Sequence, residues 1–322
     1  MKNWILGILV LIVSLSACDN TLDINAPWKE TPVVFAVIDL GQDSQIIRVQ
    51  KTYQNDISRS TNEVAQIADS LYMKNISVRI ISNNNPNVYR DLVRLAPRKD
   101  SGFFSNKDSS YWGSYMPNWF AAGVKYQLKI HSYETGNDYV GFTDMVGKAT
   151  INTLSTIDLV STSFLLFTYR IENIGSSNTA LLDMMVRLYY NEVSLANPQD
   201  TVVKYVDYYV KKNAAFSTFA SATFSQGIKK ADFLSQVKSS IKPDPTVKRT
   251  FKSFNYVVIG YNNDYRDMLI TNAPSGSIIP KFGEYTNINN GIGIFASRTL
   301  TERAQPLNTP SVNELNTYIL NP

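Results

Sequence analysis

The chain has 322 residues, of which 44% are hydrophobic and 12% aromatic, and its formal net charge is +4. Aromatic content at this level supplies a hydrophobic core and excludes a disordered or collagen-like chain, and the length is typical of about two domains. The small net charge and the lack of any Lys/Arg run exclude the charge pattern of a typical nucleic-acid binder. The chain contains one His and one Cys, so it has few of the side chains on which catalysis and zinc binding most often depend.

Residues 1–18 have the pattern of a bacterial export signal. Lys2 precedes an apolar stretch from Trp4 to Leu15. As a helix this stretch would span roughly 18 Å at about 1.5 Å per residue, whereas a bilayer core is about 30 Å thick. The stretch is therefore predicted to be a signal-peptide core and not a membrane span. It ends in Leu15-Ser16-Ala17-Cys18, which resembles the lipobox of bacterial lipoproteins.

The lipobox resemblance implies a signal peptide over residues 1–17, acylation of Cys18 by chains such as palmitate, and a lipidated tether over 18–30. The alternative is an ordinary secretory signal with an incidental Cys, but the only Cys of the chain occupies the position that the motif demands. Each buried acyl CH₂ contributes ~0.8 kcal/mol, so two or three chains bind a membrane firmly. We expect a lipid anchor in the cell outer membrane, with the periplasmic and surface faces both left open.

The first half, residues 31–150, is predicted to be a β-sandwich-like domain. The first two of its predicted strands form a hairpin across Gly41-Gln42-Asp43-Ser44, and the last two pair across residues 136–138. Residues 63–72 have helical spacing and are expected to pack on one sheet face. Alternating apolar and polar residues predict strands at 33–38, 45–51, 76–81, 88–95, 126–133 and 139–143.

The second half, residues 151–322, is predicted to be a second β-rich domain. Strands 163–171 and 181–193 are expected to be joined across 175–178, and a helix over 229–241 ends before Pro243. The spacing Ser311-Val312-Asn313-Glu314 predicts a last short helix. Further strands are predicted at 202–210, 254–261 and 268–270. The fold class is therefore mainly β, with two β-sandwich-like domains of immunoglobulin or fibronectin type and a few short helices.

Three features together resemble a family of outer-membrane and surface lipoproteins of the Bacteroidota. They are the lipobox, the segment 31–39 followed by Ile46-Ile47-Arg48-Val49, and the run YTNINNGIGIF at 285–295. The resemblance implies a lipid-anchored protein with β-sandwich domains, and it implies no activity. Within the last run, Asn-Gly-x-Gly is typical of a turn with positive φ that is followed by close backbone approach at Gly293. A phosphate loop would need a longer glycine motif that is not present.

The residues that could carry chemistry point away from an enzyme. His131 lies in a predicted strand without a G-x-S-x-G elbow, so a structural histidine is preferred. Paired carboxylates could still hydrolyse a glycoside, but spacing selects no pair. The oxygen-rich segment 262–267 suits Ca²⁺ in composition, yet it departs from an EF-hand loop, and a polar turn is preferred. We expect no catalytic residue, no metal and no cofactor.

Two aromatic segments are the candidate binding surfaces. Residues 111–120 hold five aromatic side chains broken by Gly and Pro, which either close the core or present rings to a sugar or a partner protein. If rings are exposed there, Tyr111, Trp112 and Tyr115 are the expected contacts. The tyrosines at 205, 208 and 209 are followed by only two lysines, which is too little positive charge for a typical nucleic-acid site. A Tyr-rich strand with a solvated end is therefore preferred.

These observations predict a non-enzymatic binding or assembly role at the outer membrane or cell surface. The expected partner is a protein, such as an outer-membrane barrel or a secretion component. The alternative is a glycan-binding accessory lipoprotein that uses the aromatic segment 111–120. A third, weaker hypothesis is a hydrolase with two carboxylates about 5–10 Å apart in one cleft.

Overall fold

The computed structural model describes residues 29–53, 60–83, 85–96, 110–152, 156–172, 178–216, 221–273 and 285–321. Strands make up 55% of the structure and helices 16%, which confirms the predicted mainly-β fold with a few short helices. Thr31–Pro322 form one compact unit. The predicted signal peptide and Cys18 lie outside the described residues.

The first half of the compact unit is built from antiparallel strands in the order β1-β2-β5-β4-β3-β6-β7. The two predicted hairpins are confirmed, since β1 pairs with β2 and β6 pairs with β7. The predicted helix at 63–72 is divided into two short helices. The elements are β1 (Pro32–Asp39), β2 (Ser44–Lys51), α2 (Thr61–Ala65), α3 (Ala68–Leu71), β3 (Ile76–Ser82), β4 (Asn85–Arg94), β5 (Tyr111–Tyr115), β6 (Lys125–Ser132) and β7 (Asp138–Asp144).

One hydrophobic core lies between the strands of this half. It collects the inward side chains of β1 and β2 on one side and of β3, β4 and β6 on the other, which is a sandwich-like arrangement. The inward residues alternate along each strand, as Ile47 and Val49 of β2 illustrate. Trp112 of β5 belongs to this core as well.

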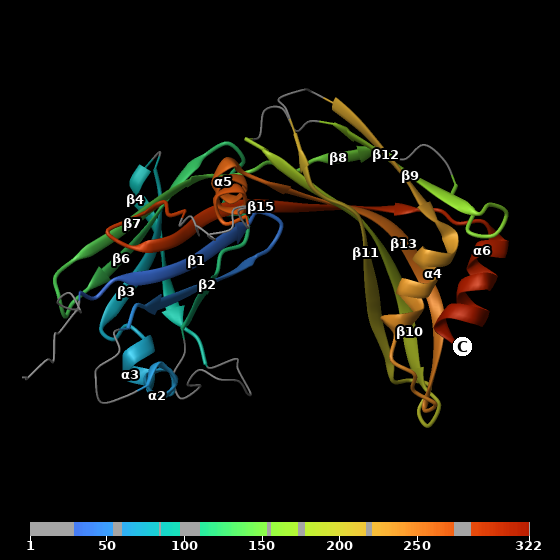
Figure 1. The fold of residues 1–322 in the computed structure, drawn as a ribbon, viewed down its shortest axis with the longest axis horizontal. Helices are drawn as coiled ribbons and strands as arrows, with labels where there is room; N and C mark the ends of the chain where they lie inside the picture. The colour runs from blue at the N-terminus through green and yellow to red at the C-terminus, as the bar shows by residue number, and fades with distance from the viewer. Residues whose placement is uncertain are drawn as a thin grey trace, which may run out of the picture. The chain divides into compact units, whose positions relative to one another are not determined.

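The second half places a small sheet, β12-β9-β8, against four strands of the large sheet, β11-β10-β13-β15 (Figure 1). A second core lies between them, where Tyr169 of β9 stacks on Tyr256 of β13 with ring centroids 4.5 Å apart. The elements are β8 (Thr150–Asn152), β9 (Phe164–Glu172), β10 (Leu181–Ser194), β11 (Thr201–Ala215), β12 (Ser221–Lys229), α4 (Lys230–Ser239), β13 (Val247–Tyr261), α5 (Asn263–Thr271), β14 (Ile288–Asn289), β15 (Ile292–Gln305), α6 (Thr309–Glu314) and the π-helical turn η1 (Leu315–Leu320).

Three sequence predictions for this half are wrong in detail. β9 and β10 lie in different sheets and do not form a pair, because β9 pairs with β12 while β10 is a central strand between β11 and β13. Residues 268–270 belong to helix α5 and not to a strand. The last helix begins at Thr309, where the Asn308 side chain accepts from the Ser311 N–H at 3.0 Å, so Ser311 is not its cap.

β15 joins the two halves. Its first part pairs in parallel with β1, from Ile292 to Arg298, and its second part pairs antiparallel with β13, from Arg298 to Gln305. Phe295 of β15 and Ile288 of β14 lie in the first core, although both come from the second half of the sequence. The division of the chain into domains at residue 150 stays a prediction.

The turn before β15 has the geometry that its glycines predict. Asn290 has φ of 60° and Gly293 has φ of 111°. A Cβ at Gly293 would lie 1.9 Å from the carbonyl oxygen of Val34 on β1. Only glycine fits there, because a side chain would collide with the backbone of the strand that β15 pairs with.

Replacing Gly293 by Ala should therefore separate β15 from β1. We expect the free energy of unfolding to fall by about 3 kcal/mol or more, since a backbone clash is added to an unfavourable φ. Gly227→Ala on β12 is the matched control, because a Cβ there meets nothing within 4 Å. Urea denaturation of the two variants measures the difference, and equal midpoints would contradict the account.

Candidate functional site

The aromatic segment 111–120 mostly serves the first core. Strand alternation on β5 directs Trp112 inward, where it is 7% exposed and lies 5.0 Å below the Arg94 guanidinium. Tyr111 is half-buried, and Tyr115 is 67% exposed. Of the three expected contacts, Tyr115 alone presents its ring freely to solvent.

His131 lies on the surface of β6 within hydrogen-bond distance of Asp138. Its Nδ1 is 2.8 Å from a carboxylate oxygen of Asp138, and its ring edge packs on Tyr133. A hydrogen bond from Lys129 lowers the pKa of Asp138, and His131 adds to this effect. Among the residues that the structure describes, no group of three or more His, Cys, Asp or Glu could hold a metal ion.

The oxygen-rich segment 262–267 begins helix α5 and is not a polar turn. The Asn262 side chain accepts from the Tyr265 N–H at 3.3 Å and donates to Asp264 at 2.8 Å and to Thr143 of β7 at 2.7 Å. Tyr285 donates its hydroxyl to the other Asp264 oxygen at 3.1 Å, and burial together with that carboxylate raises the pKa of Tyr285. The donors around Asp264 are protein groups, so the cluster fixes α5 against β7.

Asn262→Ala should destabilise this contact. The substitution removes the cap of α5 and a donor from a half-buried carboxylate, which costs about 1–3 kcal/mol. Asn272→Ala, at the exposed opposite end of the same helix, should change the stability by less than about 0.5 kcal/mol. Thermal unfolding of both variants by circular dichroism tests this, and an unchanged midpoint for Asn262→Ala would show that α5 does not depend on its cap.

The strongest candidate for a binding site is the edge of β9 that faces away from β12. The Lys230 N–H donates to the Ser163 carbonyl at 3.0 Å, and the register places Phe164 opposite Lys229. Backbone groups alternate in direction along an antiparallel strand. Odd-numbered residues of β9 therefore bond to β12, and even-numbered residues direct their N–H and carbonyl to the opposite edge.

β8 covers only the end of that edge. Its register with β9 stops at Asn152 opposite Arg170. Further along, the Phe164 carbonyl accepts from the Thr162 hydroxyl at 2.8 Å, and the Thr168 N–H donates to the Tyr256 hydroxyl. Among the residues that the structure describes, neither the N–H nor the carbonyl of Leu166 has a hydrogen-bond partner. An exposed strand edge of this kind can add another strand.

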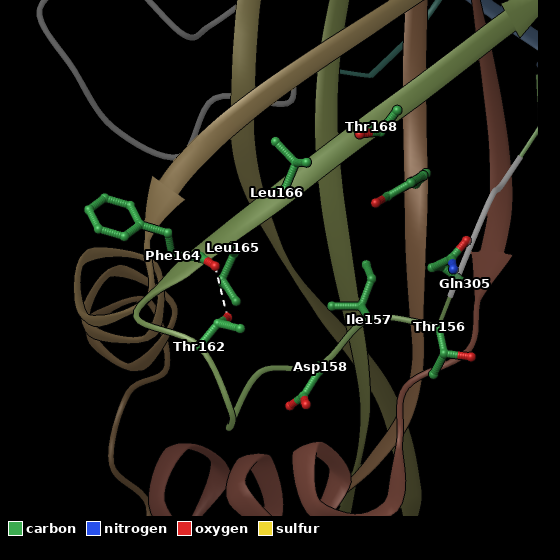
Figure 2. A pocket seen from close by; sticks show the side chains of 10 residues that line it. Thr156, Ile157, Asp158, Thr162, Phe164, Leu165, Leu166, Thr168 and Gln305 are labelled. Carbon is green, nitrogen blue, oxygen red and sulfur yellow. Dashed lines mark hydrogen bonds between the residues drawn. The ribbon is translucent and has the colours of Figure 1, made fainter.

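A cavity of about 310 Å³ adjoins the same edge. Figure 2 shows Leu166 and Thr168 on β9, with Ile157 and Asp158 on the segment that passes beneath it. Tyr256 and Gln305 of the large sheet complete the lining. Burial raises the pKa of Tyr256 to about 12, and hydrogen bonds from Ser161 and the Val160 N–H lower the pKa of Asp158. At neutral pH the cavity therefore has a neutral phenol inside and a carboxylate at its rim.

Apolar side chains also cover the outer face of β9. Phe164 is 62% exposed and Leu166 is 67% exposed, while Leu165 and Phe167 point into the core. The sequence contains a signal for this surface, the apolar run Phe164-Leu165-Leu166-Phe167, because a strand with one solvated face should alternate. The sequence predicts the strand but contains no signal for its open edge.

The comparisons with known proteins do not identify the chain. No protein-family model and no curated protein matches it. Three solved structures with remote likeness are the C-terminal globular domain of an oligosaccharyltransferase from Pyrococcus abyssi, three fibronectin domains (FN1-FN3) of chicken CNTN1, and the BSP domain of a biofilm-associated protein. Each is 8% identical, with TM-scores of 0.26, 0.17 and 0.16.

The alignments cover 72%, 86% and 84% of this chain in that order. The chain spans only 47%, 66% and 58% of the length of those three structures. Likeness at these scores carries no argument about function. In the described part of the chain, no helix has the length and apolar character needed to cross a bilayer.

Proposed function

We propose that the chain is a lipid-anchored, non-enzymatic binding protein that takes up an extended segment of a protein partner along β9. The observation that carries the proposal is the Leu166 edge, whose N–H and carbonyl have no partner among the described residues and lie beside a cavity. A strand added at an open edge gains backbone hydrogen bonds, and pockets for alternate side chains give it specificity. β9 combines both features.

The occupant is defined by what β9 presents. A strand beside Leu166 would pair with its backbone and place one apolar side chain in the cavity, between Ile157 and Tyr256. Its next outward side chain would lie against Phe164 and Leu166, whose exposure is otherwise unfavourable. These contacts fit a partner segment of alternating apolar residues, because exposed apolar patches of this kind mark interaction sites.

The anchor and the location belong to the same proposal. Acylation of Cys18 would hold the protein at the outer membrane, and the partner would be a membrane protein such as a barrel or a secretion component. The glycan alternative based on residues 111–120 is less well supported, because Trp112 is buried and Tyr115 stands alone. A carboxylate hydrolase is less well supported too, since Asp158 is the one acidic residue among the described lining of the cavity.

Leu166→Pro tests the strand-addition site directly. The Leu166 N–H points away from β12, so proline should be tolerated in the fold while removing the donor and blocking an incoming strand. We expect partner capture to fall at least roughly ten-fold, which corresponds to about 1.4 kcal/mol. The measurement is crosslinking in intact membranes from a photoreactive phenylalanine analogue at position 164, read by mass spectrometry.

Two further variants control for folding and for the side chain. Leu166→Ala keeps the N–H and should reduce capture less than proline does. Leu165→Pro removes a backbone bond to β12 and should lower the stability by about 3 kcal/mol, unlike Leu166→Pro. Full capture by a folded Leu166→Pro variant would place the partner site elsewhere, and the absence of any stoichiometric partner would overturn the binding role.

A further inference from the structure

The large sheet has a second exposed surface, on the side opposite the second core. The residues of this face follow from the register, in which Met185 lies opposite Tyr209, Arg187 opposite Asp207, and Tyr189 opposite Tyr205. On the other side of β10, Arg187 lies opposite Asn255 of β13. Helix α5 covers one end of this face, over a small cluster that includes Met185 and Val257. We call the part beyond that cluster the tyrosine face, defined by Arg187, Tyr189, Tyr205, Asp207, Tyr209, Lys212, Asn255 and Glu302.

The polar groups of the tyrosine face are held in fixed positions by one another. Arg187 donates to both oxygens of Asp207, at 2.6 and 2.9 Å, and lies 3.6 Å from Glu302 of β15. Glu302 also accepts from the Tyr189 hydroxyl at 3.2 Å and from the Asn255 amide at 2.8 Å. Such a network of planar groups is preorganised, because little side-chain freedom is left to lose on binding.

Two tyrosine rings of this face are each held by a cation. The Arg187 guanidinium lies 4.3 Å from the ring centroid of Tyr205, and the Lys212 ammonium lies 3.9 Å from that of Tyr209. The rings remain 55% and 42% exposed, respectively. A cation on a ring face attracts the ring and restrains its position. Each ring is thus fixed in place and still accessible to a ligand.

We propose that the tyrosine face binds a neutral polysaccharide chain. Sugar rings have apolar faces that stack on aromatic rings and hydroxyl groups that bond to carboxylate, amide and guanidinium groups. Tyr205 and Tyr209 are four residues apart on β11, a separation of about 13 Å at roughly 3.3 Å per residue. A chain of several sugar rings can span that distance, whereas a single sugar cannot reach both tyrosines.

The charges of the tyrosine face favour a neutral ligand. The cations Arg187 and Lys212 are balanced by the carboxylates of Asp207 and Glu302, so no net charge attracts a phosphate or sulfate polymer. The face is also distinct from the β9 edge. Tyr256 and Phe254 of β13 point to β9, whereas Asn255 between them points to the tyrosine face. The saccharide proposal therefore does not rest on the proposed function.

The test uses the mature chain in native gels that contain soluble neutral polysaccharides, with laminarin, hydroxyethylcellulose and yeast mannan as probes. We expect retardation by at least one of them, and a roughly ten-fold loss of affinity for Tyr205→Ala and for Tyr209→Ala. Tyr205→Phe keeps the ring and should retain binding within about three-fold, because stacking does not need the hydroxyl. Titration calorimetry with the retarding polymer gives the affinities.

Tyr115→Ala is the matched control, since Tyr115 is more exposed than either tyrosine but lies on β5 in the first half. Its affinity should equal that of the unchanged chain. A loss of binding in Tyr115→Ala, with no loss in Tyr205→Ala, would assign the saccharide to residues 111–120 and overturn the proposal. Retardation by none of the three polymers would overturn it as well. So would binding of poly-L-proline or heparin in their place, because either would identify the tyrosine face as a peptide or polyanion site.

Discussion

The double pairing of β15 is the constraint on which the rest of the structure depends. Its parallel pairing with β1 brings together residues 259 positions apart, such as Arg298 and Asp39, whose side chains form an ion pair at 3.0 Å. Loop closure over such a distance is unfavourable, and local contacts do not compensate for it. The first core is completed only when Phe295 and Ile288 arrive. Gly293, where a Cβ would meet the Val34 carbonyl oxygen, is therefore important for both halves of the sheet.

Buried polar groups reinforce the same junction. The Ser297 hydroxyl donates to the Asp144 carbonyl at 2.6 Å and accepts from the Val146 N–H at 3.1 Å. Asn262 reaches the same region from the start of α5. These groups are almost fully buried, so each bond lost would leave a desolvated partner behind. The ends of β7 and β13 and the interior of β15, which are far apart in the chain, are thereby held together at one place.

Local patterning predicts most strands and the partners joined by short hairpins, such as β1 with β2, but not the long-range partners. The alternation in 45–51 and 126–133 indicates a half-buried strand whichever strand is its partner. It therefore predicts β2 and β6 well. It contains no information on the parallel β1–β15 pair or on the separation of β9 from β10. The apolar run 268–270 by itself predicts a strand, whereas the Asn262 cap eight residues from its end places it in helix α5. Period two also explains why Trp112 is buried and Tyr115 exposed, but only once β5 is known to be a strand.

The two proposed binding surfaces have one structural origin, the unequal size of the sheets in the second half. β8 is three residues long, so within the described residues the small sheet leaves the Leu166 edge and its cavity uncovered. On the other side of the large sheet, α5 covers only the cluster around Val257 and leaves the tyrosine face open. The first surface offers backbone N–H and carbonyl groups without a partner among the described residues, together with apolar side chains. These groups suit a ligand that can itself donate and accept backbone hydrogen bonds. The second has polar groups largely paired with one another beneath accessible rings, which suits a ligand that stacks.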